Sequence, residues 1–306
     1  MYANDNPVRF TDPSGHKAID IAETPFGVVT GQDYAKLAAF ADVGATVNYP
    51  ALAARQVIDL FDSCSRSSDQ ASSAAVEILL MELRSYGVEP RTTNIRYDGG
   101  TSRSGGWGVG DASAVLGTVR KVASSMRLAL ITGVVSAELG RLPSSRELFR
   151  SVFAPLPIER GPYCPGRCMP WGKAFKDPNR IRLWGEKAIW SGSSSKAQEL
   201  VAHELGHVFN NVLKDAPGQW VERRSGWTCT EKEVSSGACD QQHVGLGVTK
   251  WSHPHIMYEL WSDAFASWGL GKFADTPEGR AWKSDIADFM RTTITGWYLG
   301  LVGDAL

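Results

Sequence analysis

Two histidines four residues apart, with a glutamate directly after the first, have the types and spacing needed for metal chemistry. The chain contains only six histidines, so a chance His-Glu-x-x-His is expected about once in a hundred chains of this composition. On a helix, residues at i and i+4 share one face, so His203 and His207 can both direct a ring nitrogen at one metal ion. Glu204 then lies beside that ion, where a carboxylate can serve as general base in metal-assisted hydrolysis.

A catalytic zinc ion takes three protein ligands and leaves one position open, so a further ligand is required. The segment HIMYELWSDAFASWGLG, residues 255 to 271, combines an apolar stripe with Glu259 and Asp263 at i and i+4 on one helical face. Two carboxylates on one face of an otherwise apolar helix favour a metal site. Solvated acids at a helix start are one alternative. In another, Asp263 or His255 binds the metal and Glu259 supports it.

The pattern E-x-x-S-D-x-F, residues 259 to 265, resembles the second motif of the gluzincins, a family of zinc peptidases that includes the thermolysin-like enzymes. The resemblance implies that Glu259 is the third zinc ligand, beside His203 and His207. It also implies that Asp263 accepts a hydrogen bond from His203, which fixes the tautomer of the ring and makes it a better ligand.

The remaining roles of a zinc peptidase can be assigned in the same way. Glu204 is expected to take the proton of the attacking water and to pass it to the leaving amine. His255 and Tyr258 are candidate donors to the oxyanion, because they are close in sequence to Glu259. The longer metzincin motif does not fit, since Asn210 and Leu213 stand where it has a glycine and a third histidine.

The elements that must position these residues are a helix over residues 197 to 213 and strands before it. Gly206 lowers the helix propensity by about 1 kcal/mol relative to alanine, which indicates close packing against another element. Upstream, KDPNRIRLWGEKAIW predicts two strands, IRLW and AIW. Their position resembles that of the edge strand of zinc peptidases, along which an extended substrate lies. A core strand is the alternative.

The fold class expected for the whole chain is α+β and mainly α, with a small sheet in a zincin-like domain. Apolar residues recur at helical spacing over residues 32 to 44, 50 to 62 and 71 to 86. Residues 89 to 113 form a Gly/Ser/Thr-rich break, and helices resume near Ala112, with a cap at Ser144 or Ser145. The expected divisions are a linker over 1 to 16, a helical subdomain over 17 to 160 and the zincin-like domain over 161 to 306.

The N-terminal stretch YANDNPVRFTDPSGH, residues 2 to 16, resembles the last segment of the RHS-repeat-associated core. In that family the segment closes a repeat shell, and a variable toxin domain follows. The resemblance implies a secreted effector delivered into a target cell, with an RHS shell, an immunity protein and a protein or peptide substrate as partners. His16 stands where the family commonly has leucine at its self-cleavage point, and a turn-rich tail is the alternative.

The net charge and the hydropathy of the chain argue against nucleic acids and membranes as partners. The formal net charge is −1, from 32 basic and 33 acidic residues, which disfavours a nucleic acid or an anionic membrane as partner. The longest apolar window, residues 126 to 140, contains Arg127 and Glu138 and is too short for a membrane span, so a buried helix is expected there. No signal peptide is found at the N-terminus.

Four of the five cysteines form two close pairs, Cys164 with Cys168 and Cys229 with Cys239. Their spacings of three and nine intervening residues favour short disulfide loops. A four-thiolate zinc site lacks the tight C-x-x-C spacing, and free thiols are the other alternative. Cys64 is left over, as a buried thiol.

Two other functions compete with the peptidase. A non-catalytic structural or binding module stabilised by metal would close the site with a fourth protein ligand, such as His253 or His255. A toxin of other chemistry, such as a nuclease or transferase, has only the glycine-rich stretch GGTSRSGGWGVG in its favour.

Overall fold

The structure is a computed structural model, and it describes residues 68–96, 102–163, 172–185, 195–225, 245–248 and 257–300. Several expectations fall outside these residues. They are the RHS-like segment, the helices over residues 32 to 44 and 50 to 62, the strand AIW, all five cysteines and His255.

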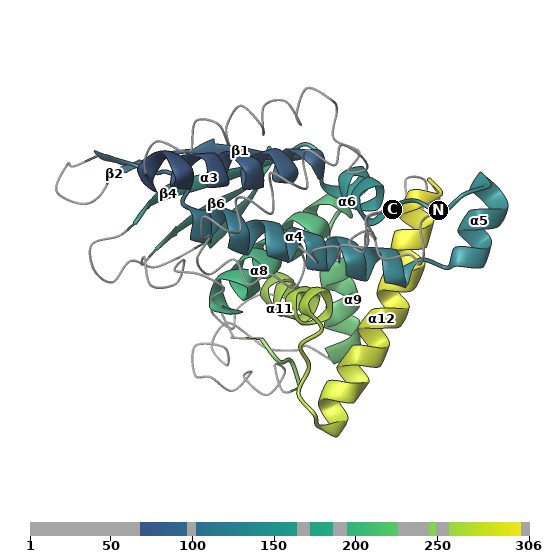
Figure 1. Ribbon diagram of the computed structural model, residues 1–306. Coiled ribbons are helices and arrows are strands. Elements are labelled where there is room, and N and C mark those ends of the chain that lie inside the picture. Colours follow the sequence, from purple (N-terminus) through teal and green to yellow (C-terminus); the bar gives the residue numbers. More distant parts are fainter. Residues whose placement is uncertain are drawn as a thin grey trace, which may run out of the picture.

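A four-stranded mixed sheet lies on one side of the molecule (Figure 1). Its order is β1 (Val88–Thr92), β4 (Leu156–Tyr163), β6 (Asn179–Gly185) and β5 (Gly172–Lys176), with only β5 antiparallel to its neighbour. A separate pair joins β2 (Asn94–Arg96) to β3 (Ser102–Ser104). The segment IRLW lies in β6, which has a neighbour on both sides, so it is the core strand given as the alternative and not an edge strand. Within the described strands, the edge beside β6 belongs to β5.

Helices make up most of the described residues, which confirms an α+β fold that is mainly α. They are α3 (Ser68–Ser85), α4 (Val109–Ala129), α5 (Thr132–Leu139), α6 (Ser145–Phe153), α8 (Ser195–Val212), α9 (Ala216–Ser225), α11 (Met257–Leu270) and α12 (Pro277–Tyr298). The cap predicted at the start of α6 is Ser144, whose hydroxyl accepts a hydrogen bond from the Glu147 backbone N–H at 3.2 Å.

One hydrophobic core joins the sheet to the helices. Helix α4 crosses the centre of the molecule and packs against α3, α6, α8 and α11 (Figure 1). Fully buried core side chains come from α4 (Val115, Val119), β4 (Ile158), β6 (Ile181, Leu183) and α8 (Val201, Leu205). The division expected after residue 160 falls within β4, and both the sheet and the core take residues from each side of it.

The single buried helix expected over residues 126 to 140 is wrong. The chain leaves the helical conformation at Leu130, and the shorter α5 follows at the periphery of the molecule (Figure 1). Met126, Leu130 and Val135 are buried, but Leu128 and Val134 are 82% and 46% exposed. Apolar composition predicted burial of the whole segment, whereas the core covers only part of it. None of the helices in the described residues is both long and apolar enough to cross a bilayer.

Candidate metal centre

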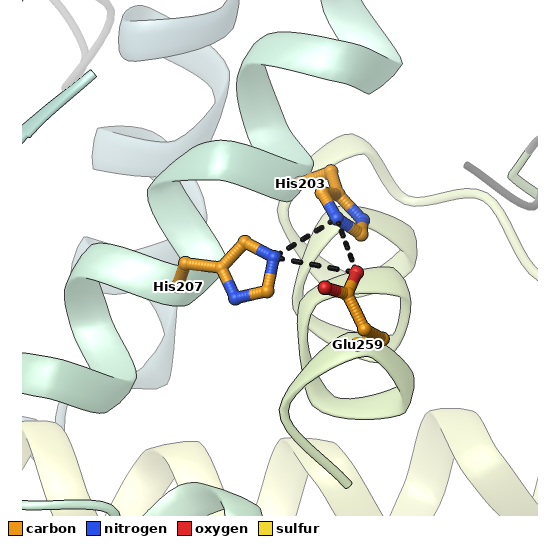
Figure 2. Close-up of side chains that lie close together, drawn as sticks. All are labelled: His203, His207 and Glu259. Atoms are coloured by element: carbon orange, nitrogen blue, oxygen red, sulfur yellow. Dashed lines mark hydrogen bonds and ion pairs between the residues drawn. The ribbon is translucent and has the colours of Figure 1, made fainter. Parts of the chain in front are cut away.

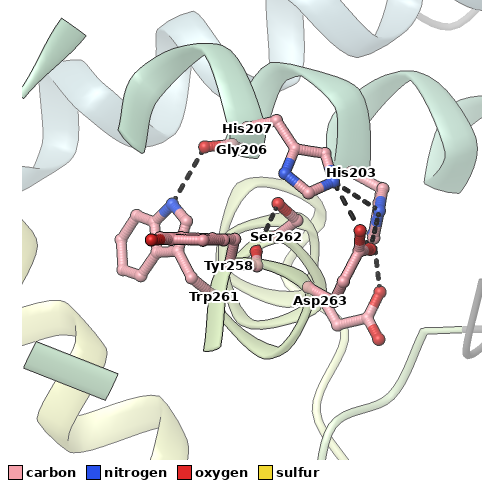
Figure 3. A network of polar contacts seen from close by, with 8 residues as sticks. His203, Gly206, His207, Tyr258, Trp261, Ser262 and Asp263 are labelled. Carbon is pink, nitrogen blue, oxygen red and sulfur yellow. Dashed lines mark hydrogen bonds and ion pairs between the residues drawn. The ribbon is translucent and has the colours of Figure 1, made fainter. Parts of the chain in front are cut away.

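Helices α8 and α11 approach each other closely, and this contact builds the site. A Cβ atom at Gly206 would lie only 2.8 Å from the Ser262 Cα, so glycine is required at this contact. The buried Trp261 indole donates a hydrogen bond to the Gly206 carbonyl at 2.9 Å, as Figure 3 shows. The close packing predicted from Gly206 is therefore confirmed, and the turns that carry His203 and Glu259 face each other.

Three potential ligand atoms converge between these helices (Figure 2). The Nε2 atom of His203 lies 3.1 Å from the Glu259 Oε2 and 3.1 Å from the His207 Nε2. The third side of the triangle, from His207 Nε2 to Glu259 Oε2, is 3.4 Å. The group formed by His203, His207 and Glu259 can hold a metal ion.

Asp263 fixes the orientation of His203 from the opposite side of the ring. Its Oδ1 lies 2.7 Å from the His203 Nδ1, and the two residues are 1% and 3% exposed. When Nδ1 donates its proton to this carboxylate, Nε2 is left as an acceptor. That nitrogen faces the Glu259 carboxylate and the second imidazole. Two ring nitrogens and one carboxylate oxygen therefore converge on one point, as the ligands of a metal cation do.

The pKa values of His203 and Glu259 are both shifted by their closeness to each other. Burial lowers the pKa of His203, but the hydrogen bond to Asp263 and the nearby carboxylates raise it to well above its usual range. Burial raises the pKa of Glu259, but hydrogen bonds from both histidines bring it well below the usual value. Positive charge is thus strongly favoured between these side chains, as a metal site requires.

Glu204 lies at the side of this group, against strand β5. The residue is 5% exposed, and a Cβ atom at Gly172 would approach its Oε1 to 2.6 Å. Burial raises the pKa of Glu204, and this outweighs the opposite effects of the two histidines and of a hydrogen bond from the Ala174 backbone N–H. The edge strand therefore passes directly beside the Glu204 carboxylate.

Tyr258 is not brought to the three ligand atoms. Its ring packs on α9, where a Cβ atom at Gly218 would lie 3.1 Å from the Tyr258 Cδ1. In Figure 3 the ring points away from the histidines, toward Trp261. The other expected donor, His255, is outside the described residues.

Two residues of the site, Gly172 and Ala174, were missed by sequence reasoning. They belong to β5, which pairs with β6 across Asp177 and Pro178. The Asp-Pro pair between GKAFK and NRIRLW was the available signal for a hairpin. Comparison of the chain with family models, with curated proteins and with solved structures found no match.

Proposed function

We propose that this chain is a zinc-dependent endopeptidase with a zincin-like catalytic fold. The observation that supports the proposal most directly is the convergence of His203 Nε2, His207 Nε2 and Glu259 Oε2 at a point beside Glu204. Metal-assisted hydrolysis needs ligands for the metal and a general base beside it. Here the two imidazoles and Glu259 can supply the ligands, and Glu204 can supply the base.

The donor set fits zinc. Zinc binds nitrogen and oxygen at about 2.0–2.1 Å, so two ligand atoms of a tetrahedral site lie about 3.3–3.4 Å apart. The three separations here are 3.1, 3.1 and 3.4 Å. Calcium and magnesium prefer shells of six or more oxygen ligands, which two imidazoles do not supply. Three protein ligands also leave a fourth position for water, as in a catalytic site.

The residues of the site have separate roles in the proposed hydrolysis. When bound, zinc supplies a Lewis acid for the scissile carbonyl and lowers the pKa of water at the site. Glu204 accepts the proton of the attacking water and delivers it to the leaving amine. Asp263 holds the His203 ring in one tautomer and one orientation. The side chains of His207 and Glu259 are 19% and 26% exposed, so a substrate can reach the centre from solvent.

Strand β5 provides a surface for an extended peptide. An edge strand offers backbone groups that pair with an added strand, and Gly172 and Ala174 lie against Glu204. A peptide paired with β5 would bring its backbone past the general base. Because the N-terminal segment resembles the RHS core, we assign the peptidase to the effector part of a secreted toxin, acting on a protein of the target cell.

The test compares zinc content and proteolysis in the full chain and in Glu204→Gln. About one zinc per chain is expected in both by elemental mass spectrometry, and cleavage of labelled casein is expected to fall about 100- to 10,000-fold in the variant. Glu199→Gln is the matched control, because Glu199 is also buried in α8 but pairs with Lys272. Zinc binding without any cleavage by the unaltered chain would favour the non-catalytic, metal-stabilised module.

A further inference from the structure

A cluster of cations surrounds one aromatic ring on the β5–β6 hairpin. The ring of Phe175 has the guanidinium of Arg180 at 4.3 Å from its centroid. The Lys173 ammonium and the Arg182 guanidinium lie at 5.3 Å each. Such contacts with the ring face stabilise each cation, but three positive charges around one ring also repel one another.

The positive charge of the hairpin is only partly balanced. Strands β5 and β6 contain two lysines and two arginines, and the turn between them contains Asp177. Lys176 pairs with Asp215 at 3.1 Å. Glu159 of β4 lies 2.8 Å from Arg182 and 3.8 Å from Arg180, so one carboxylate serves both guanidinium groups. Lys173 is exposed, and no carboxylate in the described part of the chain pairs with it. The excess positive charge therefore lies at Lys173.

Lys173 is placed where a bound peptide would meet it. Side chains alternate along a strand, so Gly172 and Ala174 face Glu204 while Lys173 and Phe175 face the other side of β5. A peptide paired with the outer edge of β5 alternates in the same way. Its side chains on the outer side then lie about 5 Å from those of β5, measured between Cβ atoms.

We infer that Lys173, supported by the Arg180 and Arg182 side chains at Phe175, is a specificity-determining residue that selects substrates with an aspartate or glutamate near the scissile bond. This inference rests on the proposed peptidase function. Gly172 and Ala174 lie beside Glu204, and Lys173 lies between them in the strand. The acidic residue of the substrate is therefore expected within about two positions of the bond that is cut.

The first experiment measures cleavage of a random peptide library by the zinc-loaded full chain, with the cut positions read by mass spectrometry. Acidic residues are expected to be enriched about fivefold near the cut, the effect of one partly solvated ion pair. Lys173→Glu should reverse the preference toward lysine and arginine. Lys283→Glu on α12, also an exposed lysine, should leave it unchanged. Equal cleavage of acidic and neutral sequences by the unaltered chain would overturn the inference.

A binding measurement separates failure of this inference from failure of the proposed function. The Glu204→Gln variant is titrated with a fluorescent peptide rich in aspartate and with the same peptide carrying asparagine instead. About fivefold tighter binding of the acidic peptide, lost in the variant that also carries Lys173→Glu, supports the acid preference even if no peptide is cut. Equal affinity for the two peptides contradicts it, whereas cleavage by the unaltered chain would leave the peptidase assignment in place.

Discussion

Two of the buried charged groups in the described residues differ in how their charges are arranged. Arg160 of β4 and Asp111 of α4 are both 0% exposed and form an ion pair at 3.1 Å. The guanidinium also donates to the carbonyls of Gly161 and Leu183, at 2.5 and 3.1 Å. Here one cation meets one anion, and donors meet acceptors.

The group at His203 is arranged differently. While the His203 Nδ1 pairs with Asp263, its Nε2 faces the Glu259 carboxylate and the His207 ring, so three potential metal ligands converge there. A buried cation that pairs with an anion and with backbone carbonyls joins elements of the fold, whereas two imidazoles and a carboxylate that converge on one point can hold a metal cation. The difference teaches that opposite charges paired between elements mark a structural ion pair, whereas metal-binding side chains gathered at one point mark a candidate site for chemistry.

The largest expected effect concerns Arg160. In Arg160→Ala the buried Asp111 loses its cation, and the free energy of unfolding should fall by about 3–5 kcal/mol. Urea unfolding measures the loss. The double variant Arg160→Met with Asp111→Asn removes both charges and should recover much of the stability. The zinc content of the folded fraction should stay unchanged in the single and the double variant. A parallel loss of zinc would show that the Arg160–Asp111 pair and the metal group are not independent.

Removal of Glu259 should affect the metal rather than the fold. Zinc affinity, measured by competition with a chromogenic chelator, should fall more than about 100-fold in Glu259→Ala, since a ligand contributes more than a supporting residue. Glu278→Ala is the matched control, because Glu278 occupies the first turn of α12 as Glu259 does that of α11. Equal zinc affinity in the two variants would show that Glu259 is an ordinary helix-start acid, with Asp263 or His255 as the ligand.

A smaller loss is expected from Asp263→Asn. The amide keeps the shape of the side chain but no longer stabilises positive charge on the His203 ring, so zinc affinity should fall about 10- to 100-fold. Ser262→Ala provides the comparison on the same helix, since the Ser262 hydroxyl donates only to the Tyr258 carbonyl. Unaltered affinity in Asp263→Asn would mean that the carboxylate has no part in tuning the metal ligand.

The smallest effect is expected at an exposed pair. Hydrogen bonds from Arg141 and from the Ser144 backbone lower the pKa of Glu147 to about 2, from an ordinary value of 4.5. Its stabilisation is complete above pH 4.5 and is lost as the pH falls toward 2, because the unfolded chain then binds the proton more readily. Since the Glu147 side chain is 45% exposed, Glu147→Gln should cost less than about 1 kcal/mol.

The measurement for Glu147 is urea unfolding of both proteins across this pH range. The stability difference between the unaltered chain and Glu147→Gln should shrink steadily as the pH falls. A difference that stays constant with pH would mean that the capping contacts of the side chain, rather than its charge, stabilise α6.

Local patterns predicted a large part of the fold and of the candidate site. Helical periodicity identified α3, α8 and α11, and the cap expected at Ser144 or Ser145 marked the start of α6. These features depend on neighbours within a few residues, so the sequence contains them directly. The choice between an edge and a core strand for IRLW, and the exposure of Leu128, depend instead on which distant elements cover a segment. Periodicity does not encode this.

The sequence by itself determined that His203 and His207 share one helical face, with Glu204 one position round from it. It also determined that Glu259 and Asp263 share a face, because helix geometry fixes residues four apart. Only the tertiary structure decided that these faces meet, through the contact at Gly206, and that β5 passes beside Glu204. It alone gathered Lys173, Arg180 and Arg182 around Phe175. The physical reason is that packing and strand pairing join residues far apart in the chain, and their partners are chosen by the whole core.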